Sequence, residues 1–192
     1  MTTTLETSTV ISPAELRAVI GIVGDARRPA GTGAYYPVPS EAALDGEFTP
    51  APDLEKIGIA LIAHHGLVAG QYTVRYFWKD KGGKSKGNLT LGKCTKPTGL
   101  LHHFAECDFV IWLAADHLRD AYPTATEVEA VVYHELRHAG ETEPDEESDE
   151  PAQATIIGHE FEGFLDEVTL YGATVRNLKP IVNAAKQLEL GV

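Results

Sequence analysis

The sequence predicts one α+β domain, in which helices are segregated from a small antiparallel or mixed β-sheet. Apolar residues recur at helical spacing near the N-terminus and through the last third of the chain, and β-branched and aromatic residues concentrate in the middle. With 192 residues, 43% of them hydrophobic, the chain can bury one sizeable core. We expect residues 12–192 to form this domain and residues 1–11 to be disordered.

Two helices are expected before the strands. A Ser-Pro pair supplies an N-cap and a first-turn proline for a helix over residues 12–24. Residues 27–52 are rich in proline and glycine, which predicts mostly irregular chain. The second helix is expected from Asp53 to about His65, because apolar residues form a stripe at helical spacing there: Leu54, Ile57, Leu61 and Ile62.

Three strands are expected in the middle of the chain. The segments Gln71–Trp78 and Asn88–Cys94 carry β-branched and aromatic residues. The polar segment Lys79–Gly87 between them is typical of a turn, so we expect these two strands to form a hairpin. The third strand, Cys107–Ala114, is an almost continuous apolar run.

The last third of the chain is expected to be helical. One helix should begin near Thr126, which lies three residues before Glu129 as in a capping box, and should end at Gly140. A second helix, opened by a proline, is expected over residues 151–171, and a third over residues 174–190.

The charge of the chain excludes some classes of protein. The net charge is -12, and seven of the 28 acidic residues lie in the segment 141–150, which we expect to be a mobile, solvated loop. An acidic protein does not suit binding to a phosphate backbone, so a nucleic-acid partner is not expected. The sequence has no apolar run of membrane-spanning length and no secretory signal, and its two cysteines suit a reducing cytoplasm.

The segment Val131–Gly140 carries a recognisable metal-binding pattern. It contains His134, Glu135 and His138 in the order H-E-x-x-H. Residues four apart lie one turn apart on one helical face, so both imidazoles can reach one tetrahedral zinc ion. Glu135 can then take a proton from a zinc-bound water and deliver it to the leaving amine. The competing interpretation is a solvated helical face with two surface histidines.

A third protein ligand is needed, and His159 is our choice. If residues 155–168 are helical, His159 lies opposite their broad apolar face, in a weaker second stripe with Gly163. A helix with two apolar sides is usually sandwiched, so His159 could face the motif helix. Glu160 and Glu162 compete for this role, because gluzincins use a glutamate at a comparable distance after the motif.

Two segments together resemble a known family. YHELRH followed by GHEFEGFLDEVTLYG is similar to the "Putative phage metallopeptidase" family, a zincin-like group with YHEL-x-H and then a helix beginning H-D-x-E-E-F. The pair is also reminiscent of SprT-like peptidases. This sequence departs from the pattern at Glu160, where aspartate is usual, and at Gly163, where the family has a glutamate.

The resemblance implies a zincin-like fold with one Zn²⁺ per chain. It implies that His134, His138 and His159 are the zinc ligands and that Glu135 is the general base. We therefore expect a zinc-dependent metallopeptidase, phage-encoded and located in the host cytoplasm, that cleaves a protein or peptide substrate paired with the strand Asp108–Ala114. The alternative is a non-catalytic, zinc-stabilised binding or regulatory protein, for example a phage anti-host factor. No membrane partner is expected, and the oligomeric state stays open.

Overall fold

The computed structural model describes residues 35–85, 87–121, 123–143, 151–159 and 170. The expected disorder of residues 1–11 and the expected helices over residues 12–24 and 174–190 lie outside these ranges. None of the helices in the described ranges is both long and apolar enough to cross a membrane.

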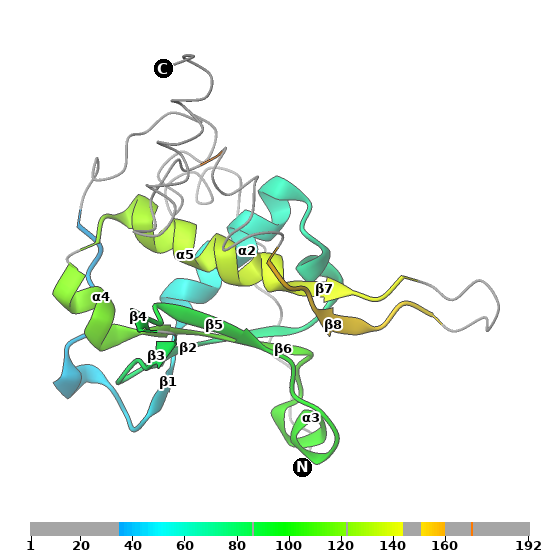
Figure 1. Ribbon diagram of the computed structural model, residues 1–192, viewed down its shortest axis with the longest axis horizontal. Coiled ribbons are helices and arrows are strands. Elements are labelled where there is room, and N and C mark those ends of the chain that lie inside the picture. The colour runs from blue at the N-terminus through cyan, green and yellow to red at the C-terminus, as the bar shows by residue number, and fades with distance from the viewer. Residues whose placement is uncertain (1–34, 86, 122, 144–150, 160–169, 171–192) are drawn as a thin grey trace, which may run out of the picture.

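A four-stranded mixed sheet forms the base of the molecule, and two helices pack on one of its faces (Figure 1). The strand order is β1-β2-β6-β5, in which β2 and β6 are parallel and the two outer pairs are antiparallel. The predicted α+β class with a small mixed sheet is therefore confirmed. The bounds are β1 Phe48–Pro50, β2 Val74–Lys79, β5 Gly92–Thr95, β6 Phe109–Ala114, α2 Pro52–His65 and α5 Ala125–His138.

The core lies between the sheet and the two helices. Side chains of a strand alternate between its two faces, so every second residue of β2 and β6 points toward α2 and α5. The predicted apolar stripe of α2 is mostly buried, with Ile62 only half-buried. On α5, Val128, Val132 and Leu136 share one face and are all buried. The buried residues that build this layer include Tyr76, Trp78, Phe109, Ile111, Leu113, Leu54, Leu61, Val128, Val132 and Leu136.

Helix α5 begins with a capping box, but two residues earlier than predicted. The Thr124 hydroxyl accepts a hydrogen bond from the backbone N–H of Glu127, and the Glu127 carboxylate accepts one from the backbone N–H of Thr124. The predicted pair, Thr126 and Glu129, has the same spacing, but Glu129 is buried. The helix ends at His138, just before the expected stop at Gly140, and Gly140 itself belongs to a strand.

The predicted hairpin between the first two strands does not form. Strand β6 lies between β2 and β5 and pairs with both. The chain between β2 and β5 forms a separate two-stranded ladder of β3, Lys84–Ser85, and β4, Asn88–Leu89. A strand that is buried on its inner face and almost continuously apolar is better placed in the centre of a sheet, which is where β6 lies.

The position of β6 corrects a functional expectation as well. Asp108–Ala114 was expected to offer its backbone to a substrate, but β6 has a neighbour on each side, so its backbone groups are used within the sheet. Strand β5 instead stands at the margin of the four-stranded sheet. Two short helices were not predicted: α3, Leu100–Ala105, which follows β5, and α4, Ala115–Ala121, which follows β6 directly.

The segment after α5 is a β-hairpin that projects from the body of the molecule (Figure 1). Strand β7, Ala139–Glu141, pairs with strand β8, Ala154–Ile156. The helix that the sequence predicts from Pro151 therefore does not begin there. The helical pattern after Pro151 depends on local spacing alone, whereas pairing with β7 determines the conformation of Ala154–Ile156. The acidic segment 141–150 therefore connects two strands rather than two helices, and its residues 144–150 lie outside the described ranges.

Candidate metal centre

Helix α5 presents both histidines of the motif on one face. His134 and His138 are half-buried, and their ring centroids lie 5.1 Å apart. Their separation of four residues produces this placement, because a helix advances one turn in 3.6 residues. The opposite side of α5 is anchored by Val132 and Leu136 in the core. The rings are therefore carried by a helix whose orientation the core fixes.

The hairpin delivers the third histidine. The chain leaves β8 at Ile156 and reaches His159 three residues later, where this side chain is exposed. The Nε2 atoms of His159 and His134 are 3.0 Å apart, and the ring centroids of His159 and His138 are 4.5 Å apart. The expected meeting of the three histidines is present, but a strand and a coil carry His159, not the face of a helix. The competing residues Glu160 and Glu162 lie outside the described ranges.

The three imidazoles form a group that suits a metal ion. One nitrogen from each ring lies within 4.8 Å of the others. Two nitrogens that are each 2.0–2.1 Å from a tetrahedral zinc ion are about 3.3 Å apart. The 3.0 Å between His134 and His159 is close to this value. In the described part of the chain, these three residues are the only such group of potential ligands.

The ring of His138 is oriented by a backbone contact. Its Nδ1 atom lies 2.7 Å from the carbonyl oxygen of Ile157, to which an Nδ1–H donates. Metal-binding histidines commonly donate their second ring N–H in this way, which directs the other nitrogen toward the ion. The backbone N–H of Ile157 also donates to the carbonyl of His138, at 2.8 Å. These two bonds tie the end of the hairpin to the end of α5.

Gly140 makes room for the returning chain. A Cβ atom at position 140 would lie 2.3 Å from Cγ1 and 2.8 Å from Cδ1 of Ile157, which is impossible without movement. The Ile157 side chain thus occupies the space that any other residue at position 140 would fill. Because Ile157 is two residues before His159, this contact helps to set where the third histidine lies.

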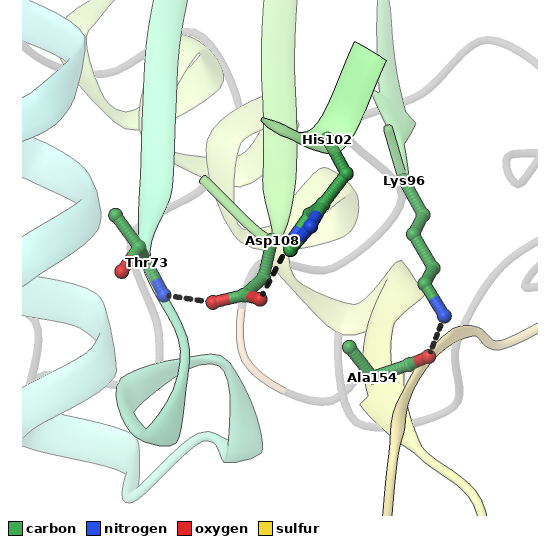
Figure 2. A network of polar contacts seen from close by, with 5 residues as sticks. All are labelled: Thr73, Lys96, His102, Asp108 and Ala154. Carbon is green, nitrogen blue, oxygen red and sulfur yellow. Dashed lines mark hydrogen bonds and ion pairs between the residues drawn. The ribbon is translucent and has the colours of Figure 1, made fainter. Parts of the chain in front are cut away.

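Two side chains hold the hairpin from the body of the protein. Lys96, just after β5, donates a hydrogen bond from Nζ to the carbonyl oxygen of Ala154 (Figure 2). The Tyr72 hydroxyl donates to Oε2 of Glu141, at 3.2 Å. Glu141 and Ala154 stand opposite each other in the β7–β8 ladder. One residue pair of the hairpin is therefore held on both of its strands.

Glu135 lies against the margin of the sheet. It is only 5% exposed, and its side chain packs over the backbone of Gly92 on β5. Cys94, two residues along the same strand, faces the same layer and is buried. Burial, and secondarily the charge of Glu135, raise the pKa of the Cys94 thiol, so this cysteine stays protonated at neutral pH. The site thus places a carboxylate beside an edge strand.

Among the described residues, Cys94, Cys107 and the His102-His103 pair do not form a second group of potential metal ligands. In the structure His102 turns toward Asp108, with Nε2 and Oδ1 3.3 Å apart (Figure 2). The other oxygen of Asp108 accepts the backbone N–H of Thr73, at 2.8 Å. Asp108 therefore joins α3 to the start of β2, which is a structural role.

Tyr133 directly precedes His134 in the sequence. It is 2% exposed, and its ring meets that of His65 edge-on, with centroids 5.0 Å apart. It belongs to the core. Three residues that shape the site were not predicted: Gly92, Gly140 and Lys96. Two of these are glycines. Their role depends on which side chain packs against them, and the neighbouring sequence does not show which side chain that is.

The fold and the site define a mixed α+β protein in which a helix and a hairpin bring three histidines together, and in which a buried glutamate follows the first of them in the sequence. The family model described as "Putative phage metallopeptidase" matches residues 46–186, and the chain belongs to this family. The family implies a metal and an action on peptide bonds. No curated protein and no solved structure matches the chain.

Proposed function

We propose that the protein is a zinc-dependent, zincin-like metallopeptidase. The observation that carries this proposal is the convergence of the ring nitrogens of His134, His138 and His159 within 4.8 Å. Glu135 directly follows His134 in the sequence. Family membership supports a peptidase in general terms. Three neutral imidazoles with a remaining open position favour zinc over magnesium or calcium, which prefer oxygen ligands.

The three histidines would hold one Zn²⁺ per chain. The bond from His138 Nδ1 to the Ile157 carbonyl fits this role, because it leaves Nε2 for the ion. When bound, zinc would polarise the substrate carbonyl and make water a better nucleophile. The protein's own contribution is a fixed set of donors on two elements that are tied together by the backbone bonds between His138 and Ile157.

Glu135 would serve as the general base. It is adjacent in sequence to His134, and it is held between α5 and β5. From there its carboxylate can accept a proton from the attacking water and pass it to the nitrogen of the leaving amine. A carboxylate that is 5% exposed is shielded from bulk water, so its interactions with the reacting groups are stronger than they would be in solution.

Strand β5 is the best candidate to hold an extended substrate. In the described part of the chain, it has a strand partner only on the β6 side. A peptide added to the other side would gain backbone hydrogen bonds along Gly92–Thr95. Because Gly92 touches Glu135, such a peptide would pass directly beside the proposed base. This placement replaces the earlier expectation for Asp108–Ala114.

The test is metal content together with cleavage of a general substrate. Purified wild-type protein should contain one zinc ion per chain by mass spectrometry. His159→Ala should lose the zinc or bind it more than about 100-fold more weakly, which exceeds the loss typical of a residue that only contacts a ligand. Glu135→Gln should keep the zinc and lose at least about 100-fold in the cleavage of fluorescently labelled, unfolded casein.

Two results would separate the alternatives. A wild-type protein that takes up no zinc, even when zinc is supplied and the excess is washed away, would contradict the metal site. One zinc ion per chain without any cleavage, and without any effect of Glu135→Gln, would support the non-catalytic, zinc-stabilised binding protein instead.

A further inference from the structure

We propose that Gly92 is a positioning residue for Glu135, and that the lack of a side chain at position 92 is what leaves room for the carboxylate against strand β5. This inference rests on the proposed function, which gives Glu135 the proton transfer. It assigns a role in the proposed reaction to Gly92, a residue of strand β5 that lies outside the H-E-x-x-H motif.

The contact involves three consecutive atoms of the glutamate. A Cβ atom on Gly92 would lie 2.9 Å from Oε1, 3.0 Å from Cγ and 3.2 Å from Cδ of Glu135. Ordinary van der Waals contacts of a Cβ atom begin at 3.4 Å. A simple rotation of the carboxylate about its last bond moves only the oxygens and does not relieve Cγ. The whole end of the side chain must therefore move.

The glutamate is the group that would yield. Strand β5 is held by the β5–β6 ladder, in which Gly92 stands opposite Leu113. Leu113 is fully buried, so the strand cannot easily retreat from α5. The atoms that crowd position 92 belong to the end of a side chain, which can shift more readily than the backbone of a paired strand. Gly92→Ala should therefore leave the fold intact and displace the carboxylate.

The backbone at position 92 does not itself require glycine. Its φ lies outside the left-handed range, unlike that of Gly46, Gly66, Gly87 and Gly99. An alanine there is also compatible with a strand, where glycine is the less favourable residue. The reason for a glycine is thus the close approach of Glu135, and not a turn or a bend.

Displacement should affect the reaction more than the metal. Glu135 is not among the three residues whose ring nitrogens converge, so zinc binding does not depend on its position. Proton transfer does depend on it, because a base must lie within hydrogen-bonding reach of the proton. Misplacement of a catalytic group by about 1 Å can lower the rate by about 100-fold.

The experiment compares wild type, Gly92→Ala, Glu135→Gln and a control, Gly83→Ala. Gly83 lies between β2 and β3, and a Cβ there would meet no atom within 4 Å. For each protein we would measure zinc affinity, thermal stability and cleavage of labelled, unfolded casein. We would also follow the visible absorption of the Co²⁺-loaded protein against pH. This spectrum reports on ionisable groups beside the metal and needs no substrate.

Gly92→Ala should bind zinc within about threefold of wild type, well below the 10–100-fold loss typical of disturbed metal sites. Its casein cleavage should fall by at least about tenfold. The pH transition of its Co²⁺ spectrum should move in the same direction as that of Glu135→Gln. Gly83→Ala should match wild type in every measurement.

The inference is overturned if Glu135→Gln changes the Co²⁺ transition and Gly92→Ala leaves both the transition and the cleavage at wild-type values. Failure of the proposed function looks different. In that case Glu135→Gln itself is indistinguishable from wild type in both measurements, and Gly92 loses its role together with Glu135.

Discussion

Helix α5 and the β7–β8 hairpin meet at the three-histidine cluster, but they are built in different ways. The helix carries two histidines on a face opposite a fully buried stripe, so packing against the sheet fixes it. The hairpin carries the third histidine and projects from the body (Figure 1). It is held by the bonds to His138 and by the contacts of Tyr72 and Lys96.

The difference suggests a division between folding and metal binding. Damage to α5 should affect the stability of the whole domain, because its side chains form the core. Damage to the base of the hairpin should affect the placement of His159 more than the stability of the domain. Each prediction below tests this division, beginning with the largest expected effect.

Leu136→Ala should destabilise the protein by about 2–5 kcal/mol, the range for truncation of a large apolar side chain in a core. Leu136 is 1% exposed and lies next to Glu135 on α5. The free energy of unfolding of the metal-free protein, from urea denaturation, measures this. The control is Ile156→Ala on β8, whose side chain is 42% exposed and which should cost less than about 1 kcal/mol. Equal losses in the two variants would contradict the proposed division.

The same division explains which parts of the structure could be predicted from sequence. Helix α5 was predictable because its signals are local: the apolar stripe, the pattern H-E-x-x-H and a cap. Even there the cap was misplaced, because Thr124 with Glu127 and Thr126 with Glu129 have the same spacing. Spacing alone cannot decide between the two pairs. The hydrogen bonds in the structure do.

The hairpin and the strand order were not predictable in this way. The helical pattern after Pro151 was real, but pairing with Ala139–Glu141 determines the conformation of Ala154–Ile156. Similarly, no local feature shows that β6 separates β2 from β5. The spacing predicts that His159 lies on a helical face, but residues 157–159 are not helical. It nevertheless lies beside His134, because the β7–β8 ladder brings the chain back to the end of α5.

Gly140→Ala tests the hairpin side directly. The new Cβ would overlap Cγ1 of Ile157, which must move by more than 1 Å to reach an ordinary contact, about 3.4 Å. We expect zinc affinity to fall by about 10–100-fold, as for other residues that orient ligands. The stability of the metal-free protein should change little. Isothermal titration with zinc measures the affinity.

The matched control for this variant is Gly158→Ala. It lies one residue before His159, and a Cβ there would meet no atom within 4 Å. It should bind zinc like wild type. If Gly158→Ala and Gly140→Ala weaken binding equally, the effect comes from stiffening of the segment and not from the contact with Ile157.

Lys96→Met removes the hydrogen bond to the Ala154 carbonyl and keeps a side chain of similar length. We expect a loss in zinc affinity of about three- to tenfold, smaller than for Gly140→Ala, because two backbone bonds between His138 and Ile157 remain. Lys96→Arg should restore most of the affinity, since a guanidinium can still donate to the carbonyl. An unchanged affinity in Lys96→Met would show that the contact does not help to place His159.

Tyr72→Phe should have the smallest effect, and that effect should depend on pH. Partial burial, and then the hydrogen bond to Glu141, raise the pKa of the Tyr72 hydroxyl above 10. A group with a raised pKa in the folded state contributes stability that is complete below its unfolded pKa and is lost as pH rises through its folded pKa. Tyr72→Phe should therefore be slightly less stable than wild type at pH 8, and the difference should shrink above pH 10.

Thermal unfolding of the metal-free proteins between pH 8 and 11 checks this expectation. Burial also raises the pKa values of Tyr36 and Tyr76, but these residues are common to both proteins and cancel in the difference. Tyr35→Phe is the control, because that side chain is 76% exposed. A difference for Tyr72→Phe that stays constant across this range would mean that its hydroxyl does not hold Glu141. The hairpin would then depend on Lys96 and the backbone of α5 alone.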